Sequence, residues 1–300
     1  EYFALDLIMD EEGACRGVLP LNNAEGTLHR YKAKGTVMAT VAGERGFEPG
    51  EHQALLGSHL GHGLGGERRV AGDVRRTIER LRGLDIEADA AGAHWVHQTF
   101  GDRRPTQYQA VQRQGRWAVH AHSVAGNSSL RRAVTLPPGQ TAGELRFSWW
   151  VPRLNDAADL RDSDIDDAVA RVVLSFDGDR HNGTWKARDH IVSELSSLIA
   201  GKPLPYASIM YVWDNRYPAG TVIPNPYTGR IRQIVVESGP ARLNQWVDFD
   251  RDVEADFRLA FGEAPGPMIG LGLMTDSNNS GAAVTAWYGP LQLTMSAPAN

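Results

Sequence analysis

Hydrophobic and polar residues alternate along most of the chain after residue 93, which is the period of a β-strand with one buried face. In "ELRFSWWVPRL" the apolar row holds Leu145, Phe147, Trp149 and Val151, and the opposite row holds Arg146, Ser148 and Trp150. In "AVARVVLSFDG" the inward row holds Ala170, Val172, Leu174 and Phe176, which leaves Arg171 outward or at an edge. Both stretches are therefore predicted to be half-buried strands.

Further runs of the same kind continue to the end of the chain and are separated by turn residues at short intervals. They are "YASIMYVWDN", "GRIRQIVVESG", "PMIGLGLMTD" and "AVTAWYGPLQLTM". This pattern predicts a mainly β fold, an antiparallel β-sandwich of jelly-roll character. Two short inserted helices are predicted, one with a stripe of Ile191, Leu195, Leu198 and Ile199, and one with Val253, Phe257 and Phe261 spaced by four.

Residues 1–92 show mixed signals, and we predict an N-terminal α/β segment there, followed by the sandwich domain over residues 93–300. The stretch 34–43 is typical of a strand. The stretch 67–83 places apolar residues on one helical face and arginines on the rest, which predicts a helix. A protein partner that docks through this N-terminal segment is one hypothesis for its role.

Composition limits the class of protein. The 300 residues carry a net charge of -5, whereas a nucleic-acid-binding domain would be basic, so no nucleic-acid partner is expected. No run of about 18 apolar residues occurs, so no transmembrane span is expected. The first residues lack the pattern of a signal peptide. Cys15 is the only cysteine, which excludes an internal disulfide and a cysteine zinc site.

Six stretches in a fixed order carry a family resemblance. They are "LRFSWWVPRL", "DIDDAVARVVLSFDGD", "PYASIMYVWDN", "GTVIPNPYTGRIRQIVVESGP", "RDVEADFRLAFGEAP" and "MTDSNNSGAAVTAWYG". Over about residues 94–293 the chain resembles a bacterial family, domain of unknown function number 3047. The resemblance implies a secreted or periplasmic β-sandwich similar to galactose-binding and carbohydrate-binding jelly rolls, and it implies no catalytic residues. The family has a second Asp where this chain has Asn278, which lowers the local charge and argues against a metal.

Acidic residues gather in "RDSDIDDAVAR", where Asp162, Asp164 and Asp166 alternate as at the start of a calcium loop. An EF-hand is excluded, because its sixth and twelfth positions here hold Asp167 and Val173 rather than Gly and Glu. A looser calcium site would use Asp164, Asp166 and Asp167. In the structural alternative, Asp166 or Asp167 pairs with Arg171 across the start of a strand.

Aromatic residues suggest a second kind of site, because sugars present apolar C–H faces that stack on flat rings and polar rims that bind Asp, Asn and Arg. The alternative is that most of these rings fill the core. Arg230 and Arg232 are predicted to share a face, where they would bind an anion or form ion pairs with the acidic cluster. The candidate ligand-binding residues are Trp150, Arg171, Trp213, Tyr227, Arg230, Asp276 and Asn279.

The loop "TDSNNSG" is expected to lie at the rim of the sandwich. There Asp276 would anchor the loop by accepting backbone N–H bonds, and Asn278 and Asn279 would adopt left-handed backbone geometry. His120 and His122 share a strand face, and we interpret them as solvated or core histidines, because a metal site needs further ligands.

No nucleophile elbow or phosphate-binding loop occurs in the sequence. The leading hypothesis is a non-catalytic module that binds a saccharide or cell-envelope polymer. The alternatives are an accessory subunit of a larger assembly and a carbohydrate-active enzyme with Asp167 and Asp276 as its carboxylate pair. No cofactor is predicted apart from the calcium alternative.

Overall fold

The chain divides into two compact units, residues 1–59 and residues 60–300. The computed structural model describes residues 2–9, 15–22, 27–28, 31–32, 67–69, 95–100, 103–200 and 203–296. In the first unit, the strands form an antiparallel sheet in which β2 pairs with each of the others. They are β1 (Tyr2–Met9), β2 (Cys15–Asn22), β3 (Thr27–Leu28) and β4 (Tyr31–Lys32).

Only the start of one prediction for the N-terminal segment falls within the described residues. The helix predicted over 67–83 is wrong at its start, because Glu67–Arg69 form strand β5, which pairs with β6. Pairing with a distant strand outweighs the local helical period there. The remaining residues of that prediction, 70–83, and the strand predicted over 34–43 lie outside the described residues. The domain boundary between residues 92 and 93 stays a prediction.

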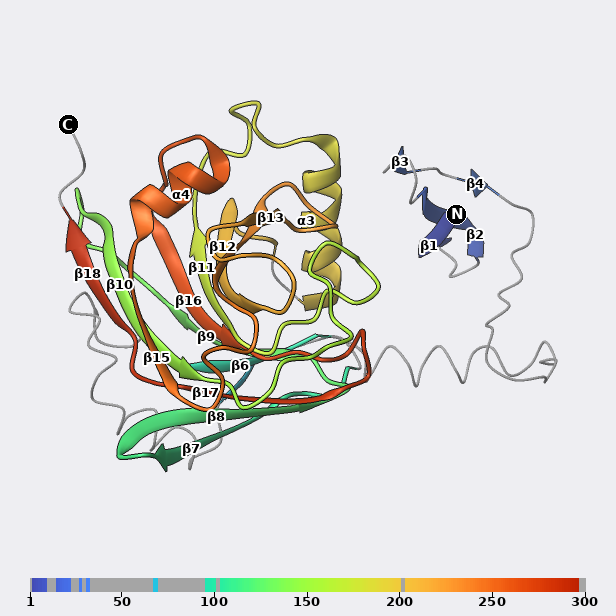
Figure 1. Cartoon of the computed structure of the whole chain (residues 1–300). Coiled ribbons are helices and arrows are strands. Elements are labelled where there is room, and N and C mark those ends of the chain that lie inside the picture. Colours follow the sequence, from blue (N-terminus) through green and yellow to red (C-terminus); the bar gives the residue numbers. More distant parts are fainter. Residues whose placement is uncertain are drawn as a thin grey trace, which may run out of the picture. The chain divides into compact units, whose positions relative to one another are not determined.

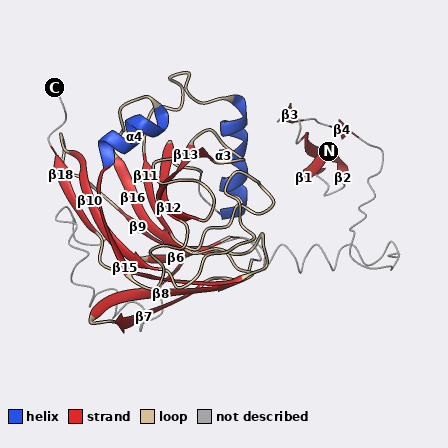
Figure 2. Ribbon diagram, viewed as in Figure 1, coloured by secondary structure: helices blue, strands red, loops and turns tan. Residues whose placement is uncertain are grey.

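The second unit is mainly β and consists of two sheets, as predicted, with both described helices at their periphery (Figures 1 and 2). The six-stranded sheet holds β7 (Gln107–Arg113), β8 (Arg116–Val124), β10 (Thr141–Trp150), β15 (Trp246–Asp252), β17 (Ala283–Tyr288) and β18 (Gln292–Ser296). The eight-stranded sheet holds β5, β6 (Val96–Thr99), β9 (Ser128–Ala133), β11 (Arg171–Phe176), β12 (Ala207–Asp214), β13 (Val222–Pro224), β14 (Ile231–Ser238) and β16 (Met268–Met274).

Strand β10 organises the six-stranded sheet. One of its edges pairs with β15 from Glu144 to Trp150, and its other edge pairs first with β18 and then, at Trp149 and Trp150, with β17. In the eight-stranded sheet the order is β13-β14-β12-β11-β16-β9-β6-β5. Strands β12 and β14 pair in parallel, and all other neighbouring strands of this sheet pair antiparallel. The predicted purely antiparallel arrangement therefore has this one departure among the described strands.

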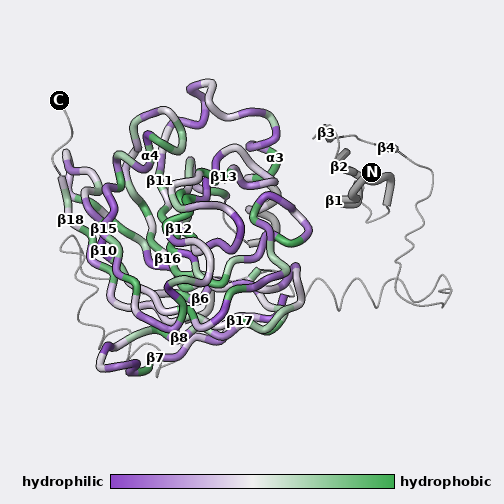
Figure 3. The backbone as a smooth tube through the Cα atoms, viewed as in Figure 1, coloured by the Kyte–Doolittle hydropathy of each residue, from purple (hydrophilic) through white to green (hydrophobic). Residues whose placement is uncertain are grey.

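Aromatic side chains from the two sheets meet in the core. The ring of Phe147 stacks on that of Tyr211 with 5.5 Å between centroids, and the Trp149 and Trp213 centroids are 6.3 Å apart. The four apolar residues predicted for this row, three on β10 and Val151 directly after it, are all buried. Figure 3 shows hydrophobic stretches along the central strands β11 and β12. Burial of this apolar surface is the main force that holds the two sheets together.

The two predicted helices are confirmed as α3 (Ala187–Ala200) and α4 (Val253–Phe261). Asp252 is the N-cap of helix α4, and its carboxylate accepts a hydrogen bond from the backbone N–H of Ala255 at 2.9 Å. It ends at Gly262, which adopts a φ of 73° that a side chain would strain. The buried Phe257 of α4 packs edge-on against Phe176 of β11, which fixes this helix to the core.

A second, smaller cluster covers the opposite face of the eight-stranded sheet. Val212 of β12 and Val235 of β14 pack there against Leu160 and Ala168, which belong to the long segment between β10 and β11. This face is therefore covered by a loop rather than by solvent. Arg171, which alternates with Val172 along β11 and pairs with Val212, lies on this covered face.

The inner aromatic layer makes a stability prediction. Replacing Trp149, which is fully buried, with Ala is expected to lower the free energy of unfolding by about 3–5 kcal/mol because a large cavity replaces the ring. Trp117→Ala is the matched control, since Trp117 is 37% exposed and its loss is expected to cost less than about 1 kcal/mol. Urea unfolding followed by circular dichroism measures both values. Equal losses would contradict the assignment of Trp149 to the core.

Candidate functional site

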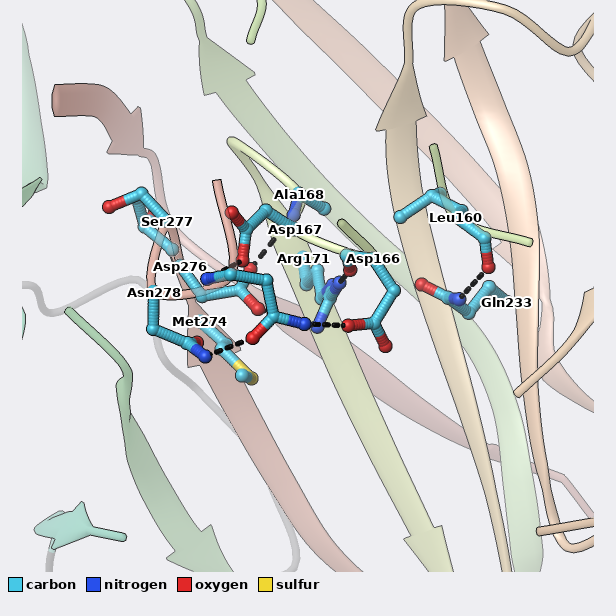
Figure 4. A network of polar contacts seen from close by, with 12 residues as sticks. Leu160, Asp166, Asp167, Ala168, Arg171, Gln233, Met274, Asp276, Ser277 and Asn278 are labelled. Atoms are coloured by element: carbon cyan, nitrogen blue, oxygen red, sulfur yellow. Dashed lines mark hydrogen bonds and ion pairs between the residues drawn. The ribbon is translucent and has the colours of Figure 1, made fainter. Parts of the chain in front are cut away.

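Two loops meet at the rim of the sandwich, one leading into β11 and one leaving β16 (Figure 4). The backbone N–H of Ala168 donates to Oδ1 of Asp276 at 2.9 Å, and the N–H of Asp276 donates back to the carbonyl of Ala168 at 3.2 Å. Asp276 therefore anchors this rim by accepting a backbone N–H bond, although the donor belongs to the other loop and not to its own. The prediction of an anchoring Asp276 is correct in kind, with a different partner.

Arg171 is the only cation held directly against Asp276 among the described residues. Its Nη1 lies 3.1 Å from Oδ2 of Asp276, and its Nη2 donates to the backbone carbonyl of Asp166. The predicted ion pair of Arg171 with the carboxylate of Asp166 or Asp167 is therefore wrong. Arg171 was predicted to lie outward or at an edge. Its side chain points away from the core but is only 6% exposed, because the two loops cover it.

The side chain of Asn279 links the loop after β16 to the loop before β11. Its Nδ2 donates to Oδ1 of Asp166 at 2.6 Å and to the carbonyl of Ser163 at 3.1 Å. The hydroxyl of Tyr227 donates to the same carbonyl at 2.8 Å. Four of the seven predicted ligand-binding residues, Arg171, Tyr227, Asp276 and Asn279, are thus brought together at this rim.

The backbone geometry predicted for the last loop is wrong. Asn278 and Asn279 do not adopt positive φ angles, and the left-handed residue of this loop is Gly281, with a φ of 69°. Glycine adopts this conformation without the steric penalty that an Asn side chain would meet. The two amide side chains instead hydrogen-bond each other, and Asn279 reaches the facing loop.

Two of the three aspartates proposed for calcium, Asp166 and Asp167, have carboxylates that accept hydrogen bonds from the protein. Asp167 accepts hydrogen bonds from the backbone N–H of Asn279 at 3.2 Å and from both the N–H and the hydroxyl of Ser280 at 2.7 and 2.5 Å. The backbone N–H of Asp164 donates to Asp162 at 3.0 Å. Within the part of the chain that the structure describes, no three His, Cys, Asp or Glu side chains are grouped to hold a metal ion.

The rim carries more negative than positive charge in a buried setting. Burial raises the pKa of Asp276 to about 7, and the neighbouring Asp167 adds to this effect while Arg171 opposes it. Burial likewise raises the pKa of Asp166. Asp167 and Asp276 are 2% and 3% exposed, so neither could flank a glycosidic bond as the sequence-based alternative of a catalytic carboxylate pair requires.

The other three predicted ligand-binding residues lie elsewhere. Trp213 is 2% exposed, and its indole N–H donates to the carbonyl of Gly239 at 3.0 Å, so alanine at this position would report on packing. Arg230 is buried and forms an ion pair with Glu263 at 2.7 Å instead of pairing with the acidic cluster of the rim. The guanidinium of Arg230 lies 4.9 Å and that of Arg232 5.4 Å from the Phe261 ring, so these arginines do share a face.

Trp150 belongs to a stack on the outer face of the six-stranded sheet, which is the face opposite the core. The guanidinium of Arg113 lies 4.0 Å from the Trp150 ring and 3.9 Å from the Trp287 ring. The Trp287 ring in turn stacks on His120 at 4.5 Å, and Trp150 meets Trp246 edge-on. We call Arg113, His120, Trp150, Trp246 and Trp287 the outer-face stack.

Sequence reasoning missed Arg113 and underrated His120. Alternation placed His120 and His122 on one face of β8 and Trp150 on the polar face of β10. The strand register then aligns Trp287 of β17 with both His120 and Trp150, because each pair is directly opposite across neighbouring strands. Alternation within one strand can be read from the sequence, whereas this alignment across strands cannot.

Most cations on the outer face have carboxylate partners. Arg116 holds both oxygens of Asp248, at 2.5 and 3.2 Å, and Arg146 contacts Asp250 at 2.9 Å. Arg113 has no such partner among the described residues. Burial lowers the pKa of Arg113, and burial together with His122 and Arg113 lowers the pKa of His120, which favours the neutral imidazole.

Comparison with known proteins gives one family. The model of the family described as "Protein of unknown function (DUF3047)" matches residues 93–292. No helix of the described residues has the length and apolar content needed to cross a membrane.

Short local similarities to the flavoprotein component of succinate dehydrogenase also occur. The rice mitochondrial protein is 65% identical over 40 residues, which cover 13% of this chain and 6% of that protein. One mitochondrial form from Xenopus laevis is 55% identical over 47 residues, 16% of this chain and 7% of that protein. The protein of Rickettsia felis is 55% identical over 40 residues, 13% and 6%. Because the chain spans only 6–7% of these relatives, their activity does not carry over to it.

The buried ion pair makes the first prediction for the rim. Arg171→Met is expected to lower the free energy of unfolding at pH 8 by about 3–5 kcal/mol, because it leaves buried carboxylates without their cation. Arg146→Met is the matched control, since Arg146 also lies between two carboxylates but is exposed. Its loss is expected to leave stability nearly unchanged. Denaturant unfolding of both variants checks this, and equal effects would contradict a special role for Arg171.

The raised pKa of Asp276 makes a second prediction. The folded protein holds this proton more tightly than the unfolded chain, so the stability it contributes is fully present below about pH 4 and is lost as the pH rises through about 7. Asp276→Asn removes this dependence. The difference in unfolding free energy between the wild type and the variant is expected to change by on the order of 3 kcal/mol between pH 5 and pH 8. Parallel pH profiles would show that Asp276 does not titrate in this range.

Proposed function

Because the chain belongs to the DUF3047 family of unknown function over residues 93–292, we propose a function from its geometry: a non-catalytic module that binds a saccharide or cell-envelope polymer. The proposed binding surface is the outer face of the six-stranded sheet. The observation that carries the proposal is the outer-face stack, in which aromatic rings from β10, β15 and β17 adjoin an arginine of β7 and a histidine of β8.

The chemistry of this face suits a sugar. Trp246 and Trp287 are partly buried, so each ring is held by its neighbours and keeps some surface in solvent. A pyranose ring can place its C–H groups on such indoles while its hydroxyls reach polar groups beside them. His120 and Thr285 supply those polar groups, and their side chains are fixed by a mutual hydrogen bond of 2.7 Å.

The rim supports the module in a different way. Arg171 and Asp276 are buried, and all their side-chain polar atoms except the Nε of Arg171 bind each other or backbone groups. We therefore propose that they hold two loops together instead of meeting a ligand. Tyr227 is 46% exposed, and Asn279 lies near it, so these two remain the rim residues with ligand-binding potential. We propose a structural role for the ion pair and place the main ligand surface on the sheet.

The finer structural class is also part of the proposal. Two mainly antiparallel sheets with short inserted helices support kinship with jelly rolls of the galactose-binding type, in which ligand binding is common on loops and sheet faces. A module for a cell-envelope polymer would work in the periplasm or outside the cell, and we propose that location on the basis of its ligand class.

A glycan and polysaccharide array tests the proposed function. The wild type is expected to bind at least one polymer, and Trp287→Ala and Trp246→Ala are each expected to weaken that binding about two- to tenfold, which corresponds to the loss of one stacked ring. Trp117→Ala is the matched control. Trp117 is an exposed tryptophan of the same sheet, but it pairs with Gln112 and lies on the other face of β8 from His120.

Two outcomes would count against the proposal. The first is the absence of binding to any saccharide. The second is binding that Trp117→Ala weakens as much as Trp287→Ala does, because the ligand would then not be read by the outer face. Melting temperatures of the three variants establish that each is folded before its binding is compared.

A further inference from the structure

Arg113 stands apart from the other arginines of the outer face. Arg116 and Arg146 each contact at least one carboxylate, so their charges are neutralised locally. The guanidinium of Arg113 is instead held by two indole rings, Trp150 and Trp287, at 4.0 and 3.9 Å. Among the described residues no acidic side chain pairs with it, so one positive charge on this face has no counterion from that part of the chain.

The hydrogen-bonding capacity of Arg113 is also unused. Its Nε is buried and has no acceptor among the described residues, and the indole N–H of Trp150, in contact with it, has none either. The terminal Nη atoms likewise have no protein acceptor there, and they stay within reach of solvent. A guanidinium that is held in place, partly desolvated and unpaired binds an anion more strongly than a mobile surface arginine does, because less side-chain entropy is lost on binding.

We infer that Arg113 binds a carboxylate of the ligand, and that the ligand is therefore an acidic polysaccharide containing uronic acid residues. This inference rests on the proposed function and specifies its substrate class. The two indoles cover the guanidinium, so a ligand would approach it at the edge formed by the Nη atoms. A planar carboxylate can accept two parallel hydrogen bonds at that edge. The sugar ring that carries the carboxylate then lies beside Trp287, over the partly exposed part of the stack.

The charges around Arg113 favour a ligand that carries one negative charge on each sugar unit bound there. His120 stacks on Trp287 as a side chain whose neutral form is favoured, so it adds no second cation at neutral pH. Asp248 and Asp250 on β15 lie on the same face, but they are paired with Arg116 and Arg146, so the charge of Arg113 is the one among these three arginines that is left for an anion. A uronic acid polymer, with one carboxylate per acidic sugar, fits this balance better than a polyphosphate does.

Matched polymers test the inference without any mutation. Polygalacturonate, alginate and hyaluronate are each compared with the carboxyl-reduced form of the same polymer, with sodium polyphosphate as a further probe. The wild type is expected to bind at least one carboxylated polymer about tenfold more tightly than its reduced counterpart, as expected for one charge-assisted contact. In Arg113→Gln this preference is expected to disappear, whereas in Arg116→Gln it is expected to persist, because Arg116 is already paired with Asp248.

Each other result has a defined meaning. Equal binding to the acidic and reduced polymers, tighter binding to polyphosphate, or a dimer that blocks the face in light scattering overturns the inference. If binding is Trp287-dependent but insensitive to the carboxylate, the proposed function stands and the inference fails. If Arg113→Gln does not fold, Arg113→Lys is used, and retention of the full preference by Lys would show that a bidentate contact is not made.

Discussion

The packing of Phe147 and Trp149 against Tyr211 and Trp213 is the contact on which the rest of the molecule depends. Side chains along a strand alternate between faces, so once Trp149 is buried between the sheets its neighbour Trp150 must point to the outer face. The same rule on β11 turns Arg171 away from the core as soon as Val172 enters it. The rim and the outer-face stack are therefore both consequences of one layer of apolar contacts.

The two regions use the same chemical group in opposite ways. At the rim, the guanidinium of Arg171 has a carboxylate and a backbone carbonyl as partners and is covered by loops. On the outer face, the guanidinium of Arg113 has aromatic rings as neighbours and no acceptor among the described residues. The Nε of each arginine is buried without a hydrogen-bond partner among the described residues, so the difference between them is the ion pair. A charge in a buried ion pair stabilises loop positions, whereas a fixed charge without an ion pair is suited to recognition.

The sequence predicted those features that depend on local periodicity. Alternation identified the strands and the inner face of β10, and the four-residue spacing of Val253, Phe257 and Phe261 identified α4. It did not predict the partner of Arg171, because Asp276 is 105 residues away and the choice between it and a nearby Asp depends on how strands align. It also did not predict the stack around Arg113, which needs the register of β7, β8, β17 and β10 together.

The strand order has a consequence for how the chain acquires its structure. The hydrogen bond between Ala168 and Asp276 joins residues 108 positions apart, and Arg116 meets Asp248 across 132 positions. Closing such long loops costs entropy before any contact compensates for it, so domains with this topology fold slowly compared with helical bundles of similar stability. The ion pair of the rim requires β16 to lie beside β11, and a chain in which β17 and β18 have not yet docked has an edge of β10 open to pairing with another chain.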